Sequence, residues 1–193
     1  AAGGNALWLR ATWQGEKIQP YVEAIIDRVR NHPRIKLLLD SEVIETSGIL
    51  GNFTSTIATG GATMTTTAIE HGVTVLATGG KEYQPTEFLY GQHPNVLTHK
   101  QMDEAMTAGD ARVAAADTAV FIQCVGSREE GHTWCSRICC TASIKHAIDM
   151  KERNPDARIF VLYRDIRTYG FREEHYTRAR EMGIAFVRYE PEA

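Results

Sequence analysis

The sequence lacks an excess of charge of one sign, a long apolar run and any low-complexity tract or internal repeat. Its 21 Lys and Arg residues nearly balance 24 Asp and Glu residues, so the formal net charge is −3. That balance gives no reason to expect a nucleic-acid partner. No apolar run approaches the roughly 20 residues that a membrane-spanning helix needs. With 43% hydrophobic residues in 193, the composition is that of a globular chain with a substantial core.

The first residues, AAGGNALWLRATW, also lack a basic segment followed by an apolar one, so they do not resemble a signal peptide. We therefore expect a cytoplasmic, reducing compartment. In that compartment clustered cysteines bind metal or carry out redox chemistry more often than they form disulfides.

Cysteine is absent everywhere except in one stretch, which holds Cys124, Cys135, Cys139 and Cys140 with the spacing C-x10-C-x3-C-C. Thiolates are the soft ligands that iron–sulfur clusters need, and an anionic cluster would be favoured at the N-terminus of the helix that follows. A tetrahedral zinc site also takes four cysteines. Thiol–disulfide chemistry and a purely structural role are the remaining interpretations, although an adjacent pair bridged to itself would be strained. Residue types and spacing leave these four alternatives open.

Hydrophobic periodicity predicts a helix and a β-meander in the first half of the chain. Pro20 fits a first helical turn, apolar residues recur at helical spacing from Val22 to Val29, and Pro33 should end the helix. Residues 35–40 resemble a strand. Short β-branched runs broken by glycines follow over 42–78, which predicts antiparallel strands, the last of them (73–78) apolar enough to be buried.

From about residue 109 the hydrophobic pattern changes to short apolar runs that alternate with helical segments. We expect strands at 118–124, 157–163 and 184–190, and helices at 139–155 and 172–183, the second ending at Gly183. Strand–helix–strand–helix–strand predicts a parallel sheet with right-handed crossovers, which is half of a nucleotide-binding-type fold. The fold class is therefore α/β, with domains at 1–108 and 109–193.

The glycine-rich phosphate loop of such folds is missing. After the first parallel strand the chain reads Cys124-Val125-Gly126-Ser127-Arg128, with one glycine of the usual three. A nicotinamide nucleotide is therefore not expected to bind here in the usual way. Cysteines occupy the position instead.

Several motifs resemble the A subunits of heterodisulfide reductases, a flavin and iron–sulfur family with relatives among quinone-interacting oxidoreductases. They are FIQCVGSRE, WCSRICCTASIK, RDIRTYGF and VLATGG, and the resemblance extends over residues 3–192. It implies an FAD/NAD(P)-binding, thioredoxin-reductase-like fold. Residues 1–108 would then be a partial FAD-binding domain with the meander, and residues 109–193 a Rossmann-like half domain that carries the cysteine loop.

The resemblance also implies the cofactors. A 4Fe–4S cluster would be held by the four cysteines. FAD would lie beside Thr78 and Gly79, and Gly3 and Gly4 resemble the end of a second flavin loop. The plain alternative for ATGG is a sequence that only ends a strand.

Lys145 is the candidate catalytic residue, because the resemblance implies that it points at the flavin ring. A cation there would stabilise the anionic reduced flavin and tune its potential. The alternative is a solvated lysine on a helix face. Asp103 and Glu104 match an acidic stretch near the flavin, although family members usually have Glu where Asp103 stands, and we assign them no role. His146 is expected to be solvated on its helix.

The expected function is an electron-transfer segment of an FAD and 4Fe–4S oxidoreductase. A first flavin loop with G-x-G-x-x-G and C-x2-C-x2-C cluster motifs are missing, so we expect the middle of a longer polypeptide, inactive by itself and a poor binder of FAD. Expected partners are other subunits of a redox complex, and a homodimer is compatible with the sequence. The alternative is a non-enzymatic zinc-binding structural or interaction domain.

Overall fold

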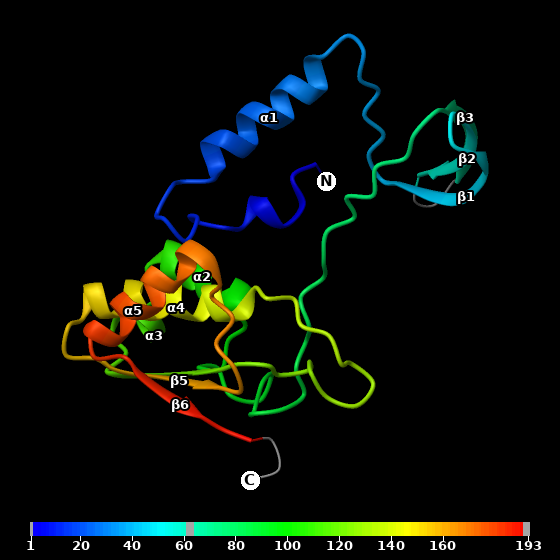
Figure 1. The fold of residues 1–193 in the computed structure, drawn as a ribbon. Coiled ribbons are helices and arrows are strands. Elements are labelled where there is room, and N and C mark those ends of the chain that lie inside the picture. The colour runs from blue at the N-terminus through cyan, green and yellow to red at the C-terminus, as the bar shows by residue number, and fades with distance from the viewer. Residues whose placement is uncertain (1, 61–63, 191–193) are drawn as a thin grey trace. The chain divides into compact units, whose positions relative to one another are not determined.

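The computed structural model describes residues 2–60 and 64–190 as a mixed α/β chain with two separate three-stranded sheets (Figure 1). The chain divides into two compact units. Unit 1 comprises residues 1–7 and 19–81, and unit 2 comprises residues 8–18 and 82–193. The domains expected at 1–108 and 109–193 were defined by fold type, whereas these units are defined by contacts within the chain. The boundary after residue 108 therefore stays a prediction.

Unit 1 contains the expected helix and an antiparallel meander. Its elements are η1 (Gly4–Leu7), α1 (Gln19–Asn31), β1 (Ser41–Ile49), β2 (Asn52–Thr59) and β3 (Thr65–His71). The sheet order is β1-β2-β3, and both neighbouring pairs are antiparallel. A two-residue turn joins β1 to β2, and Gly51 supplies its left-handed residue with φ 89°. The predicted start of the third strand, residues 62 and 63, lies outside the described residues.

Two expected strands do not form. Residues 35–39 and 73–78 have no strand assignment, and Val75 and Leu76 are each 84% exposed. The prediction of a buried strand at 73–78 was therefore wrong, as was the strand at 35–40. A strand needs a neighbour for its backbone N–H and C=O groups. Neither run pairs with another strand among the described residues, so apolar composition alone did not produce one.

Unit 2 is built on a parallel sheet of order β4-β5-β6. Its elements are α2 (His99–Ala108), α3 (Ala111–Ala114), β4 (Thr118–Ile122), α4 (Cys139–Arg153), β5 (Arg158–Tyr163), η2 (Gly170–Arg172), α5 (Glu173–Glu181) and β6 (Ala185–Arg188). The β-α-β-α-β prediction is confirmed. Helices α4 and α5 lie over the same face of the sheet (Figure 1).

The hydrophobic core of unit 2 lies between that face and the helices. Ile159 and Val161 of β5 are 2% and 0% exposed, and the face of α4 that packs there includes Ile144, Ala147 and Ile148. Gly183 has φ 79°, the left-handed conformation expected just beyond the end of α5. The core therefore fixes the position of α4, which carries Cys139, Cys140 and Lys145.

Candidate functional site

The cysteine loop connects the end of β4 to the start of α4, the edge at which parallel α/β sheets place their ligands. Its backbone is strained at three non-glycine residues with left-handed φ: Cys124 at 64°, Arg128 at 62° and Arg137 at 58°. Such residues cost of order 1 kcal/mol each and cluster at functional sites. That cost indicates that the loop is shaped for a purpose other than connection.

Gly126, the one glycine of the phosphate-loop position, is required sterically. It has φ 63°, and a Cβ at this position would lie 2.2 Å from the ring of Tyr83. The ring packs directly on the backbone of the loop. Glycine here therefore serves loop packing, rather than the approach of a phosphate.

The adjacent cysteines begin α4. A hydrogen bond from Cys140, with backbone N–H groups of Cys124, Cys139 and Cys140, lowers the pKa of Cys139 to about 6 against the effect of burial. The pKa of Cys140 is raised, because its thiol donates to Cys139 and is buried. The pair therefore carries one thiolate near neutral pH, and the thiolate is the metal-binding form of cysteine.

The structure brings the other two cysteines to the same loop. Cys124 is buried and interacts electrostatically with Cys139 and Cys135. Within residues 2–60 and 64–190, however, no three His, Cys, Asp or Glu side chains are placed to hold a single metal ion. A four-iron cluster is larger than one ion, so its thiolates stand further apart than the four ligands of a tetrahedral zinc.

Several buried polar side-chain atoms before α4, in its first turn and in the segment after β5 have no hydrogen-bond partner. Among the described residues they include the Nε2 of Gln123, the Oγ1 of Thr141, the Nε of Arg167 and the Oγ1 of Thr168. Gln123 contacts Cys140, with 3.2 Å between Oε1 and Sγ, and the backbone N–H of Arg167 points at the same sulfur. Unmet buried donors are costly. An anionic sulfur cluster would offer acceptors to them, so the residues present fit such a group.

Positive charge also surrounds the loop. Arg128 lies 3.9 Å from the Sγ of Cys124 and forms an ion pair of 2.6 Å with Asp165, and Arg164 donates to the carbonyl oxygen of Arg128. Arg167 lies 3.5 Å from Asp165. The RDIRTYGF segment therefore makes local Arg–Asp pairs and contacts the cysteine loop with the same side chains.

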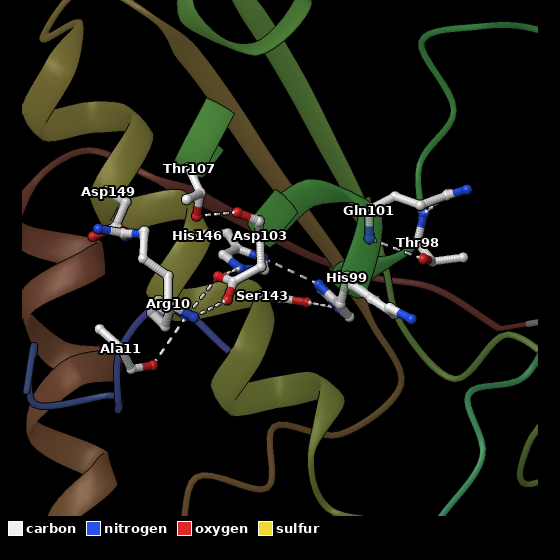
Figure 2. A network of polar contacts seen from close by, with 12 residues as sticks. Arg10, Ala11, Thr98, His99, Gln101, Asp103, Thr107, Ser143, His146 and Asp149 are labelled. Carbon is white, nitrogen blue, oxygen red and sulfur yellow. Dashed lines mark hydrogen bonds and ion pairs between the residues drawn. The ribbon is translucent and has the colours of Figure 1, made fainter. Parts of the chain in front are cut away.

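A second cluster centres on Asp103, which is fully buried (Figure 2). Its Oδ1 accepts from the Nζ of Lys145 at 2.7 Å and from the Nε2 of His146 at 2.9 Å, and its Oδ2 accepts from the backbone N–H of Arg10 at 2.6 Å. Burial alone would raise the pKa of Asp103, but these hydrogen bonds outweigh burial and hold it well below its usual range. Asp103 is therefore an ionised carboxylate in the interior.

His146 is 2% exposed, so the expectation that it would be solvated was wrong. Its Nδ1 lies 3.3 Å from the Nδ1 of His99, whose Nε2 lies 3.2 Å from the Oγ of Ser143 (Figure 2). Burial lowers the pKa of His146 and lowers that of His99 to about 3. Both imidazoles are therefore neutral at physiological pH.

Sequence reasoning missed α2, which carries both His99 and Asp103. A usable signal was present in the letters THKQ. Thr98 and Gln101 form a capping box, in which each side chain bonds the backbone of the other residue at 3.3 and 2.9 Å. That motif could have located the helix, and with it the acid of this cluster.

Lys145 faces both this cluster and a hollow of about 250 Å³ in unit 2. Its side chain is 12% exposed, and its Nζ also donates to the carbonyl oxygen of Ala11 at 3.2 Å. The hollow is lined by Arg10, Ala11, Thr12, Trp13, Gln14, Gly15, Lys145, Ile148, Asp149, Glu152, His175 and Arg178. Lys145 is thus neither fully solvated nor free, because an ionised acid holds it at the wall of a cavity.

The predicted flavin glycines lie in unit 1, where two of their segments meet. Asn5, which follows Gly3 and Gly4, donates to the carbonyl oxygen of Gly80 at 2.8 Å, next to Thr78 and Gly79. Thr78 and Gly79 are exposed, and Gly79 has φ 70° with open space at its Cβ position. The two segments that were expected to share one cofactor therefore adjoin within their unit.

Fold and site together define an α/β protein with a thiol-rich loop at the carboxyl edge of a parallel sheet and a buried acid–lysine pair nearby. Sequence comparison finds relatives of the chain. The chain is 37% identical over 134 residues to the A subunit of the ferredoxin/F(420)H(2)-dependent CoB-CoM heterodisulfide reductase of Methanosarcina acetivorans, a match that covers 62% of this chain. It is 39% identical over 139 residues, 64% of the chain, to the A subunit of the H(2):CoB-CoM heterodisulfide,ferredoxin reductase of Methanothermobacter thermautotrophicus.

The iron–sulfur A subunit of the CoB–CoM heterodisulfide reductase of Methanocaldococcus jannaschii is 36% identical over 136 residues, 62% of the chain. The chain is thus homologous to the A subunits of heterodisulfide reductases, and the resemblance carried by its motifs is confirmed. These matches span 17%, 21% and 21% of the three relatives, about a fifth of their length. No family model matches the sequence. None of the helices in the described residues is long and apolar enough to cross a membrane.

Proposed function

We propose that the chain is an electron-transfer segment of an FAD- and 4Fe–4S-containing oxidoreductase of the heterodisulfide reductase type. The observation that carries the proposal is the cysteine loop, with its lowered thiol pKa, its unmet buried donors and its arginines. When bound, FAD would supply a two-electron carrier and the cluster a one-electron carrier. Cys124, Cys135, Cys139 and Cys140 would be the cluster ligands.

Each feature of the loop has a role in this function. The N-terminus of α4 and the guanidinium of Arg128 would offset the negative charge of four thiolates, because helix N-termini and cations favour anions. The buried donors near Cys140 would bond the sulfur atoms, and hydrogen bonds of that kind set cluster potentials. The loop therefore supplies both the ligands and their electrostatic surroundings.

Lys145 would be the cation beside the flavin ring. It lines the hollow and is held there by Asp103, so its charge has a fixed position. A fixed cation favours an anionic reduced ring and raises the reduction potential. Gly3, Gly4, Thr78 and Gly79 would contact FAD. Their segments adjoin through Asn5 and Gly80, and Gly4 and Gly79 have open space at their Cβ positions. The partners would be further subunits of a redox complex in the cytoplasm, and the names of the relatives support such a complex.

The test is the metal content of anaerobically purified protein. Wild type should carry about four irons and a similar amount of acid-labile sulfide per chain, with broad absorbance near about 400 nm. Cys139→Ser should lose most of the iron, because serine replaces a thiol whose lowered pKa favours the metal-binding thiolate. Ser136→Ala, an exposed change in the same loop without loss of a thiol, is the matched control and should retain it. Stoichiometric zinc in a colourless sample would instead support a structural or interaction domain.

A further inference from the structure

The cluster around Asp103 extends beyond the acid–lysine pair that the proposed function uses. His146 contacts the same Oδ1 of Asp103 as Lys145, and hydrogen bonds continue from His146 through His99 to Ser143 (Figure 2). Ser143 is fully buried and His146 nearly so. A buried polar chain is stable only when each donor meets an acceptor. That requirement fixes where each hydrogen lies.

The order follows from the ionised acid. A carboxylate only accepts, so His146 must donate from Nε2. A neutral imidazole has one donor, so the Nδ1 of His146 accepts, and the Nδ1 of His99 at 3.3 Å must donate to it. The Nε2 of His99 then accepts from the hydroxyl of Ser143 at 3.2 Å. All the hydrogens run in one direction, from Ser143 toward Asp103.

We propose that His146 and His99 are positioning residues that hold Asp103 as a fixed anion beneath Lys145. The proposal rests on the flavin role of Lys145 proposed above. The carboxylate receives donors on both oxygens, from α4 through His146 and from the N-terminal segment through Arg10, so it cannot rotate away from the lysine without breaking one of them. His99 orients His146 in turn, because it fills the acceptor on the other side of the ring.

The charges around this chain of hydrogen bonds are all partnered within the same cluster. Lys145 and the backbone of Arg10 face Asp103 directly, and the guanidinium of Arg10 pairs with Asp149. Among the residues that the structure describes, Asp103 alone gives either imidazole a carboxylate within hydrogen-bond distance. A protonated His146 or His99 would therefore share its one counter-ion, Asp103, with Lys145. Burial of both imidazoles disfavours protonation further.

The first test reads the hydrogen order itself and needs no cofactor. Long-range ¹H–¹⁵N spectra of the wild-type chain assign the tautomer of each imidazole. We expect the Nε2–H form for His146 and the Nδ1–H form for His99, both unchanged from about pH 8 to about pH 5, whereas an ordinary histidine titrates in that range. An Nε2–H form for His99, or a normal titration of either ring, overturns the proposed order.

The second test reads the effect on the flavin of the FAD-loaded protein. His146→Leu removes the donor to Asp103 and should shift the flavin midpoint potential and its dependence on pH. His146→Gln retains a donor and should restore both toward wild type. His93→Gln is the matched control and should leave both unchanged, since His93 is an exposed histidine of unit 2 that lines neither the hollow nor the Asp103 cluster. An unchanged potential in His146→Leu overturns the positioning role.

The outcomes separate this inference from the proposed function. Absence of bound iron and acid-labile sulfide in the wild type would overturn the proposed function, and the tautomers would still report the hydrogen order. Normal iron and flavin content with the wrong tautomers would overturn only the positioning chain. Should His146→Leu fail to fold, the recovery of wild-type behaviour in His146→Gln and the wild-type tautomers decide the matter.

Discussion

Both units of the chain contain helix and a three-stranded sheet, but they bury very different shares of their residues. Among the described residues of unit 1, only Val22, Ser55 and Ala58 are buried. Unit 2 has a core of thirteen buried hydrophobic residues and a polar cluster in which Asp103 is fully enclosed. Apolar sequence is present in both units. What differs is whether a second layer covers the sheet, which α4 and α5 do in unit 2.

The largest expected effect is on the core of unit 2. Ile159→Ala should lower the free energy of unfolding by about 2–5 kcal/mol, because the side chain is 2% exposed and its removal leaves a cavity. Leu76→Ala, an apolar truncation at an 84% exposed position of unit 1, should change it by no more than about 0.5 kcal/mol. Urea unfolding followed by tryptophan fluorescence measures the effect of Ile159→Ala, since all three tryptophans lie in unit 2. Hydrogen exchange of the unit 1 amides measures the effect of Leu76→Ala.

A loss of several kcal/mol in Leu76→Ala would break the comparison. It would mean that residue 76 is packed in the folded protein and that unit 1 has a core of its own. A small effect of Ile159→Ala would have the opposite meaning, namely that the sheet of unit 2 contributes little to stability.

The parts of the fold that sequence predicts are those in which local pattern and tertiary packing agree. The helical spacing from Val22 to Val29 and the apolar face of α4 both form as expected. Residues 73–78 fail because burial of a strand depends on a neighbouring strand, and no local pattern encodes that neighbour. The helix α2 was missed, although its capping box is legible in the sequence and Met102, Ala105 and Met106 recur at helical spacing on its buried face.

The candidate site divides in the same way. The cysteines can be recognised from the sequence, because four of them in one loop are chemically unusual. The structure places them around the start of α4. Asp103 and His146 cannot be recognised as site residues in this way, because aspartate and histidine are common on protein surfaces. Their meeting depends on α2 crossing α4, which is a long-range contact between residues 43 apart. Lys145 was found only through family resemblance, and its partner only through the structure.

The second prediction concerns the stability of unit 2 at acidic pH. In unfolded chains the pKa of histidine is about 6.5, whereas burial lowers that of His99 to about 3 and lowers that of His146 as well. Below about pH 6.5, His99 and His146 therefore bind protons in the unfolded chain but stay neutral in folded unit 2. Stability should fall as pH falls from about 6.5 toward 3, by up to about 1.4 kcal/mol per pH unit for each histidine.

The measurement is the urea midpoint of metal-free, reduced protein between about pH 5 and pH 4, below the range in which Cys139 titrates. Tryptophan fluorescence again reports unit 2. The double variant with His99→Asn and His146→Gln should show a flatter pH profile, because two of the groups that take up protons on unfolding are gone. A wild-type midpoint that does not move over this interval would contradict the buried neutral pair.

The smallest expected effect tests what stabilises unit 1 in place of a core. Ser55 is 6% exposed, and its hydroxyl lies 2.8 Å from the Nε2 of His71 on β3 and 2.9 Å from the Oγ1 of Thr46 on β1. Ser55→Ala removes both cross-strand bonds and should cost about 1 kcal/mol. Thr54→Ala, an exposed change on the same strand, should cost less than about 0.5 kcal/mol.

Hydrogen exchange of the β2 amides measures this effect locally. Faster exchange in Ser55→Ala, with an unchanged tryptophan-detected midpoint, means that the sheet of unit 1 opens independently. A midpoint lowered by the same amount means instead that the two units unfold as one, and their unequal burial would then not imply unequal stability.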